Sequence, residues 1–252
     1  MAAPVVLLTD FGASEYAGIL KGVIARHAPG APVIDLCHDV SPQGVREGAW
    51  LLAQAFRWFP QGSVFLAVVD PGVGTERRAL AIETEAGFFV GPDNGLLFPA
   101  ASAAGIRRAV ALEVPPGASA TFHGRDVFAP AAARLAAGAA LERLGSPIPH
   151  PEAQLVPLSF WLQGREGEIV RIDRFGNCIT NLPALPGRTE YEACIEVGRL
   201  PARLKQVATY REAPPGEPVA IVNSYGTLEI AVRDGSAAEV IGTRVQSRVT
   251  LA

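Results

Sequence analysis

The protein has 252 residues, and its 22 lysines and arginines against 25 aspartates and glutamates give a formal net charge of -3 at pH 7. This balance excludes the strongly basic surface of a general nucleic-acid-binding protein. Hydrophobic residues make up 49% of the sequence and charged residues 19%, so the chain can bury a large core and does not belong to the disordered class. A chain of this length forms one or two domains.

The N-terminal segment and the cysteines favour a cytoplasmic protein. The start of the sequence has no basic region, and Asp10 interrupts its short apolar run, so we expect no signal peptide. No apolar stretch reaches the roughly 18 residues that a transmembrane helix needs. Cys37, Cys178 and Cys194 are odd in number and widely spaced, which favours three buried thiols in a reducing compartment over a disulfide framework.

The first part of the chain alternates between strand-like and helix-like patterns. An apolar run over 5–8 predicts a strand that leads into a polar turn, and apolar residues at helical spacing predict a helix over 16–27. A strand over 32–36, a helix over 45–56 and a strand over 63–69 follow. This β-α-β-α-β order is typical of an α/β domain with a largely parallel sheet covered by helices.

The remaining patterns divide the chain in two. Short strands over 79–84 and 87–90 and an alanine-rich helix over 126–137 complete an N-terminal α/β domain, residues 1–150. The proline-dense segment around 145–158 predicts a semi-rigid linker. Beyond it we find only strand-like runs, so we expect a C-terminal all-β, barrel-like domain over residues 151–252. These runs cover residues 168–173, 193–197, 219–223, 228–232 and 247–251.

Acidic residues that follow apolar strands are the first candidates for a binding site. Ligands of open parallel sheets bind beyond the carboxyl ends of the strands, where Asp10 and Asp70 are expected. Two glycines in residues 71–75 permit a tight turn and a close approach of the backbone to a ligand. Asp70 can alternatively cap a turn, but the Arg77-Arg78 pair that follows favours a site.

Two more segments combine polar residues with glycine. Asn94 lies in a Gly-Pro-Asp-Asn-Gly turn over 91–95, and Asn-Gly by itself is mostly a hairpin signal. His123 directly precedes a predicted helix whose N-cap can be Asp126. A histidine in this place can equally be a hydrogen-bonded structural residue.

Several kinds of site are poorly supported by the sequence. The four histidines lack the spacing of a zinc site, so we expect no metal ion. The phosphate-binding patterns GxxxxGK[ST] and GxGxxG are absent, as is the GxSxG elbow of serine hydrolases.

The second domain carries an unusual mixture of side chains over residues 172–181. An acid, an aromatic ring and two asparagines surround Gly176. This mixture suits an amphiphilic ligand, because the ring offers a flat apolar face and the amides offer hydrogen bonds. The Asn-Ser-Tyr-Gly segment over 223–226 has the same character. Ordinary hairpin turns explain either segment equally well.

Taken together, the motifs resemble one family from about residue 5 to residue 249. The sequence looks like an S-adenosyl-L-methionine (SAM) hydroxide adenosyltransferase, a relative of the SAM-dependent fluorinase and chlorinase. The motifs occur in the order of that family: TDFG at 9–12, VDPGVGT at 69–75 with Arg77, GPDNG at 91–95, FHGRD at 122–126, DRFGN at 173–177 and NSYG at 223–226. The sequence departs from the family at Glu15, where an aspartate is usual, and this leaves a ligand role for Glu15 in doubt.

The resemblance implies an enzyme that converts SAM and water to adenosine and L-methionine. SAM is then the substrate, and no cofactor is implied. The implied catalytic set is Asp70, Arg77 and His123, with Arg77 preferred to Arg78 because of its seven-residue offset from Asp70. The halogenating relatives replace this aspartate, so Asp70 favours water over halide as the nucleophile. The resemblance also implies a homotrimer in which SAM lies between the N-terminal domain of one subunit and the C-terminal domain of its neighbour.

The resemblance assigns substrate-binding residues as well. Asp10 is expected to accept hydrogen bonds from the ribose diol, and Asp173 to pair with the methionine ammonium. The other implied substrate contacts are Phe175 and Asn177 at the adenine, Ser224 at the amino-acid end, and Asn94 and Tyr225.

The chemistry agrees with these roles. Attack at the ribose C5′ expels a neutral thioether, which needs no protonation, so the difficulty lies in positioning and activating water. A carboxylate and an imidazole can accept or relay its proton, and a guanidinium can stabilise the developing hydroxide. The sequence leaves open which residue accepts the proton. It also leaves two alternatives: a SAM-dependent halogenase that makes 5′-halo-5′-deoxyadenosine, and a non-catalytic SAM or adenosine sensor.

Overall fold

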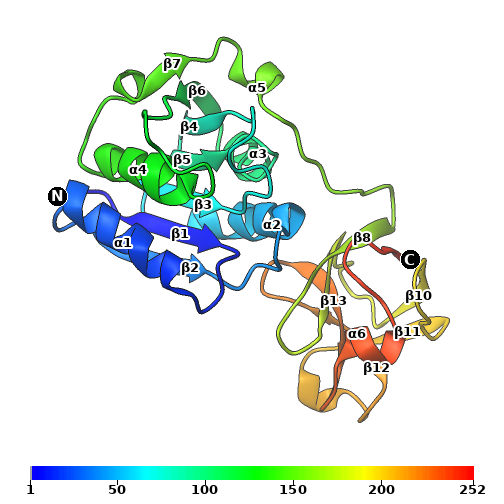
Figure 1. Cartoon of the computed structure of the whole chain (residues 1–252). Helices are drawn as coiled ribbons and strands as arrows, with labels where there is room; N and C mark the ends of the chain where they lie inside the picture. Colours follow the sequence, from blue (N-terminus) through cyan, green and yellow to red (C-terminus); the bar gives the residue numbers. More distant parts are fainter. Residues whose placement is uncertain (1) are drawn as a thin grey trace. The chain divides into compact units, whose positions relative to one another are not determined.

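The computed structural model describes residues 2–252, which form two compact units, one ending at Leu158 and one beginning at Ser159 (Figure 1). No helix among these residues is both long enough and apolar enough to cross a bilayer.

The first unit is built on a seven-stranded sheet in the order β2-β1-β3-β5-β4-β6-β7. β2, β1, β3 and β5 pair in parallel, whereas β4 and β7 run antiparallel to their neighbours. Five of the seven strands therefore point the same way, and the predicted largely parallel sheet is confirmed. The strands are β1 (Val5–Thr9), β2 (Val33–Cys37), β3 (Ser63–Val68), β4 (Ala79–Thr84), β5 (Gly87–Pro92), β6 (Ile106–Leu112) and β7 (Gly145–Pro147).

Helices cover both faces of this sheet (Figure 1). Helices α1 (Glu15–His27) and α4 (Ala129–Ala136) lie on one face, and α2 (Val45–Ala55) and α3 (Phe98–Ala103) lie on the other. Successive strand residues point to opposite faces, so Val5 and Leu7 pack under the first pair of helices while Val6 and Leu8 pack under the second. Both faces are buried, which explains the continuous apolar runs in the sequence.

The predicted helix over 126–137 begins earlier than expected. A π-helical turn, η2 (Gly124–Phe128), leads directly into α4. Asp126 thus lies inside the helical segment, and its predicted role as N-cap is wrong. Its Oδ2 instead accepts a hydrogen bond from the Ser119 backbone N–H at 2.8 Å, and its carboxylate pairs with the neighbouring Arg125.

The proline-dense segment after residue 144 carries secondary structure within the first unit. β7 pairs with β6, and a short helix, α5 (Pro151–Gln154), follows. Ile148 and Leu155 are buried against the same core as α2 and α3. Two apolar side chains thus hold residues 145–155 on the sheet.

The second unit is a closed barrel with the strand order β10-β11-β12-β13-β9-β8-β14. This confirms the predicted barrel-like domain. All neighbouring pairs are antiparallel except β11 and β12, which are parallel. The strands are β8 (Glu166–Ile172), β9 (Cys178–Pro183), β10 (Glu190–Ile195), β11 (Arg203–Val207), β12 (Pro218–Val222), β13 (Thr227–Val232) and β14 (Arg248–Leu251).

Side chains on β13 divide between the inside and the outside of the barrel. Leu228 and Ile230 belong to the large inner core, whereas Ala231 belongs to a separate outer cluster. That outer cluster also includes Val207 and Ala213, which flank a 3-10 turn, η4 (Tyr210–Glu212). The β11–β12 connection therefore packs on the outer face of β12 and β13.

The second unit also contains a short helix, α6 (Ala237–Ile241), which the sequence analysis did not identify. Ser236 caps this helix by accepting a hydrogen bond from the Glu239 N–H at 3.2 Å, and Gly242 ends it with a φ of 74°. The helix has only five residues, too few for a helical period to be visible in the sequence.

The cysteines differ from the expectation of three buried thiols. Cys178 is buried, and burial raises the pKa of its thiol to about 12. Cys37 is half-buried, and Cys194 is exposed because it lies on the outward face of β10. The prediction is correct for Cys178 and wrong for Cys194.

Candidate active site

Asp70 and Arg77 form a two-pronged ion pair beyond the carboxyl end of β3. The Arg77 Nε donates to Asp70 Oδ1 at 2.8 Å, and Arg77 Nη2 donates to Asp70 Oδ2. Both side chains are almost fully buried, with 9% of the arginine and 6% of the aspartate side chain exposed. Such a fork fixes the orientation of both planar groups.

His123 joins this pair through the same guanidinium. Its Nδ1 lies 3.0 Å from Arg77 Nη2. A guanidinium can only donate, so Nδ1 is the acceptor and the proton of the neutral ring is on Nε2. Burial and the neighbouring Arg77 charge lower the pKa of His123 below its ordinary value of 6.5. The structure thus brings the three predicted catalytic residues into one hydrogen-bonded set.

A pocket of about 290 Å³ opens in front of this set. Asp10, Asp70 and His123 all line it. Asp10 Oδ2 accepts a hydrogen bond from the Gln43 backbone N–H at 2.9 Å, and Gln43, which also lines the pocket, has a left-handed φ of 62°. This non-glycine residue is thus held in a strained conformation where it orients a predicted ligand-binding carboxylate.

Arg78 and Asn94 are placed differently. Arg78 turns away from Asp70, and its Nε donates to Asp93 Oδ2 at 2.7 Å. Asn94 does not line the 290 Å³ pocket. Its Nδ2 donates to the Val69 carbonyl at 2.9 Å, so it braces the backbone directly before Asp70. Glu15, the first residue of α1, is exposed and lies outside the pocket lining.

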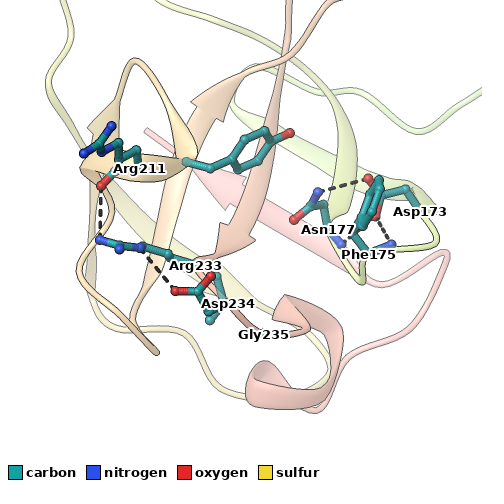
Figure 2. Close-up of a pocket in the computed structure, with 9 residues that line it drawn as sticks. Asp173, Phe175, Asn177, Arg211, Arg233, Asp234 and Gly235 are labelled. Atoms are coloured by element: carbon teal, nitrogen blue, oxygen red, sulfur yellow. Dashed lines mark hydrogen bonds and ion pairs between the residues drawn. The ribbon is translucent and has the colours of Figure 1, made fainter.

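In the second unit, Asp173, Phe175 and Asn177 share a pocket of about 940 Å³, here called the barrel pocket (Figure 2). Asp173 Oδ1 accepts from the backbone N–H groups of Phe175 and Asn177, both at 2.9 Å, and Asp173 Oδ2 accepts from Asn177 Nδ2 at 3.0 Å. Phe175 is 70% exposed, which is unusual for an aromatic side chain and suits a stacking surface.

The turn that carries these residues depends on Gly176. Its φ is 83°, and a Cβ atom at this position would lie 2.2 Å from the Ser236 Oγ. The Gly176 carbonyl accepts a hydrogen bond from the Ala238 N–H of α6 at 2.9 Å. Only glycine combines this backbone conformation with so close an approach to α6.

The opposite wall of the barrel pocket contains residues that the sequence analysis missed. Figure 2 shows Arg233, whose Nη1 donates to the Arg211 carbonyl at 3.3 Å and whose Nε lies 3.3 Å from Asp234. Tyr210 also lines this pocket. These residues come from the β11–β12 connection and the end of β13 and carry no local motif that could have identified them.

Ser224 and Tyr225 line a second pocket of about 460 Å³, here called the adjacent pocket. Asp173 and Tyr210 line both this pocket and the barrel pocket. The predicted binding residues of the second unit thus fall into two neighbouring pockets with a shared wall. Among residues 2–252, no group of three or more histidine, cysteine, aspartate or glutamate residues is arranged to hold a metal ion.

The fold and these residues define a class of two-domain protein. The first domain is a helix-covered sheet with a buried Asp-Arg-His set, and the second is a barrel with an acid, an aromatic ring and an amide at its pocket. Residues 5–145 match the SAM hydroxide adenosyltransferase N-terminal domain, and residues 167–250 match the C-terminal domain of the same family. The chain belongs to the SAM hydroxide adenosyltransferase family.

Similar proteins agree with this assignment. An (R)-S-adenosyl-L-methionine hydrolase of Thermus thermophilus is 46% identical over 96% of each chain. A fluorinase of Actinoplanes sp. is more distant, at 27% identity over 90% of each chain. The crystal structure of a conserved protein from Thermotoga maritima has a TM-score of 0.87 at 34% identity and covers 98% of this chain and 100% of its own.

Proposed function

We propose that the protein hydrolyses SAM at the ribose C5′ to give adenosine and L-methionine. The observation that carries this proposal is the buried Asp70-Arg77-His123 set at a pocket that Asp10 also lines. The family assignment and a 46% identical relative named as a SAM hydrolase support the choice of substrate.

The reaction needs an activated and positioned water more than it needs an acid. As the water oxygen bonds to C5′, the C5′–S bond breaks and its electron pair passes to sulfur, which leaves as the neutral thioether of methionine. The water loses one proton. Holding the water in line behind C5′, away from bulk solvent, addresses the entropy and the desolvation of this weak nucleophile.

The hydrogen bonds indicate a separate role for each of the three residues Asp70, Arg77 and His123. Since His123 Nδ1 already accepts from Arg77, its Nε2–H is left to donate to the water oxygen and orient it. Asp70 then receives the proton, through a lone pair that Arg77 does not use. Arg77 holds both groups and stabilises the negative charge that develops on the water oxygen.

The remaining residues bind the substrate. Asp10 accepts from the ribose diol with the carboxylate oxygen that Gln43 leaves open. In the second unit, Phe175 and Asn177 contact the adenine, Asp173 pairs with the ammonium, and Ser224 and Tyr225 hold the amino-acid end. Asn94 acts indirectly, by bracing the backbone before Asp70.

We further propose that the protein acts as a cytoplasmic homotrimer in which each substrate is held by the N-terminal unit of one subunit and the C-terminal unit of its neighbour. The catalytic set and the expected adenine and methionine contacts lie in different units, which is why one substrate needs both. The free cysteines Cys37, Cys178 and Cys194 suit a reducing compartment.

The test is to incubate the purified protein with SAM in chloride-free and in chloride-containing buffer and to identify the nucleoside products by chromatography and mass. Adenosine and methionine in both buffers are expected. Chloride-dependent 5′-chloro-5′-deoxyadenosine would instead identify a halogenase. Tight SAM binding without any product would identify a sensor.

A further inference from the structure

The proposed function makes no use of the Glu229 carboxyl, which lines the adjacent pocket. This residue is only 3% exposed, and its cross-strand neighbours, Ile221 on β12 and Ile179 on β9, are apolar. Burying a carboxyl beside apolar side chains costs free energy that an apolar residue would not cost. Packing of the barrel therefore does not explain Glu229.

Glu229 is hydrogen-bonded to the tyrosine that the two pockets share. The Tyr210 hydroxyl donates to Glu229 Oε1 at 2.5 Å. Tyr210 lines the barrel pocket and the adjacent pocket, so the position of its ring sets the shape of both. Half of the residue is exposed, and a ring with a free hydroxyl would be able to turn toward solvent.

The backbone beneath this ring is fixed separately. The Thr209 Oγ1 donates to Glu212 Oε1 at 3.1 Å, and the Ala208 N–H donates to Glu212 Oε2 at 3.2 Å. Ala213 is buried in the outer cluster of the barrel. The segment is thus anchored at its base, and Glu229 fixes the far end of the tyrosine side chain.

Two charged side chains lie near the Tyr210–Glu229 pair. Asp173 from the β8–β9 turn and Arg171 from β8 line the same pocket as Glu229. Burial, and also Asp173, raise the pKa of Glu229. Burial and the bond to Glu229 raise the pKa of Tyr210, so its hydroxyl keeps the proton and remains the donor.

We propose that Glu229 is a positioning residue for ligand binding: by holding the Tyr210 hydroxyl, it fixes the tyrosine ring as the wall shared by the two pockets. The identity of the ligand, an adenosine-containing molecule, rests on the proposed function. Glu229 touches neither the substrate nor the reacting atoms in this proposal and acts through Tyr210.

The experiment uses the full chain and measures the Kd of adenosine by calorimetry, KM and kcat for SAM, and unfolding in urea. Glu229→Leu is expected to weaken adenosine binding about tenfold and to raise KM by a similar factor, while kcat stays within about twofold. Glu229→Gln keeps an acceptor oxygen and should restore binding to within about threefold of wild type. Glu192→Leu, at an exposed position on β10, is the matched control and should bind as wild type.

Two further readouts separate positioning from a structural role. Glu229→Leu should unfold at no lower urea concentration than wild type, because it removes a buried carboxyl. In a Tyr210→Phe background, Glu229→Leu should cause no further loss of affinity. Three results would overturn the proposal. The first is wild-type affinity for adenosine in Glu229→Leu, and the second is a loss of affinity from Glu229→Leu that is as large in the Tyr210→Phe background as in wild type. The third is a loss of affinity in Glu229→Leu accompanied by a loss of stability in urea.

The wild-type protein tests the proposed function separately from the role of Glu229. If the wild-type protein binds adenosine but releases no product from SAM, the hydrolase proposal fails while the adenosine titrations still decide the role of Glu229. If it binds neither compound, both proposals fail.

Discussion

Arg77 links the two other members of the proposed catalytic set, since one guanidinium donates to the Asp70 carboxylate and to the His123 imidazole. Its Cζ also lies 5.2 Å from the centre of the buried Phe128 ring, which supports the group from a third side. The three side chains are therefore held in place by one another, and each member depends on the protonation state of the others.

Replacement of Asp70 tests proton transfer directly. Asp70→Asn keeps the size of the side chain but loses the basic oxygen, so kcat is expected to fall by roughly 10²–10⁴-fold while adenosine still binds. Asp39→Asn, at an exposed position, is the control and should keep the wild-type kcat. A kcat for Asp70→Asn within about threefold of wild type would contradict the role of Asp70 as proton acceptor.

The lowered pKa of His123 predicts how activity depends on pH. The site needs an unprotonated Nδ1, and the pKa lies below 6.5, so kcat/KM should persist below pH 6.5 and fall only as the pH passes through the lowered value. The check is kcat/KM measured against pH. A fall in kcat/KM with its midpoint at or above pH 6.5 would be inconsistent with the lowered pKa of His123.

The same shift affects stability. The folded state resists protonation of His123, so its contribution to the free energy of unfolding is present above pH 6.5 and is lost as the pH falls through the lowered pKa. His123→Asn should lack this loss. The check is urea unfolding of both proteins across this range of pH.

At the scale of elements, the turn between β2 and α2 controls Asp10 through the Gln43 N–H. Gln43→Pro removes this donor and cannot adopt a φ of 62°, so KM for SAM should rise about tenfold or more. Gln43→Gly keeps the donor and suits the left-handed backbone, so its KM should stay near wild type. Equal KM values for the two variants would show that the N–H does not orient Asp10.

Gly176 in the β8–β9 turn and Gly187 in the β9–β10 connection form a matched pair of glycines. Gly176 and Gly187 have φ values of 83° and 74°, but a Cβ at Gly176 meets Ser236 while a Cβ at Gly187 meets nothing within 4 Å. Gly187→Ala should cost about 1 kcal/mol of backbone strain, and Gly176→Ala should cost roughly 1–3 kcal/mol more. Urea unfolding measures both, and equal costs would mean that α6 moves aside freely.

The elements that the sequence predicted are those with a strong local period. β4 was predicted at its observed limits, since its apolar run is buried against the core. β11 was missed because charged and polar residues interrupt its pattern, and α6 was missed although Ser236 and Glu239 form a capping pattern. In β11 and α6, a short or partly polar sequence left too weak a pattern for the element to be identified.

The residues of the candidate site also fall into those that the sequence identified and those that it did not. Motifs identified Asp70, Arg77 and His123, but the contact between Arg77 and His123 spans 46 residues and exists only in the folded unit. Tyr210 and Glu229 lie in no sequence motif. The barrel register and the β11–β12 connection bring them together, so their hydrogen bond could not be predicted from the sequence. Residue types are visible in a sequence, whereas hydrogen-bond partners arise from topology.

At the scale of the whole molecule, the homotrimer proposal predicts that two inactive variants restore each other. Asp70→Asn damages the site residues of the first unit, and Phe175→Ala damages those of the second. After the two are mixed, dissociated and reassembled, about a quarter of the sites should carry two intact halves if neighbouring subunits share each site. No recovery of activity would contradict a shared site, and ultracentrifugation should show about 80 kDa, three chains of 26.5 kDa.

The parallel pairing of β11 with β12 also has a consequence for how this barrel can be altered. Antiparallel neighbours can be joined by two residues, but parallel neighbours need a connection that carries the chain back along the full strand. Residues 208–217 do this, and they carry Tyr210 on the way. Shortening this loop would therefore open the barrel as well as remove a pocket wall. The pocket can therefore be reshaped by replacing side chains in residues 208–217, whereas loops can be shortened at the antiparallel hairpins of the barrel.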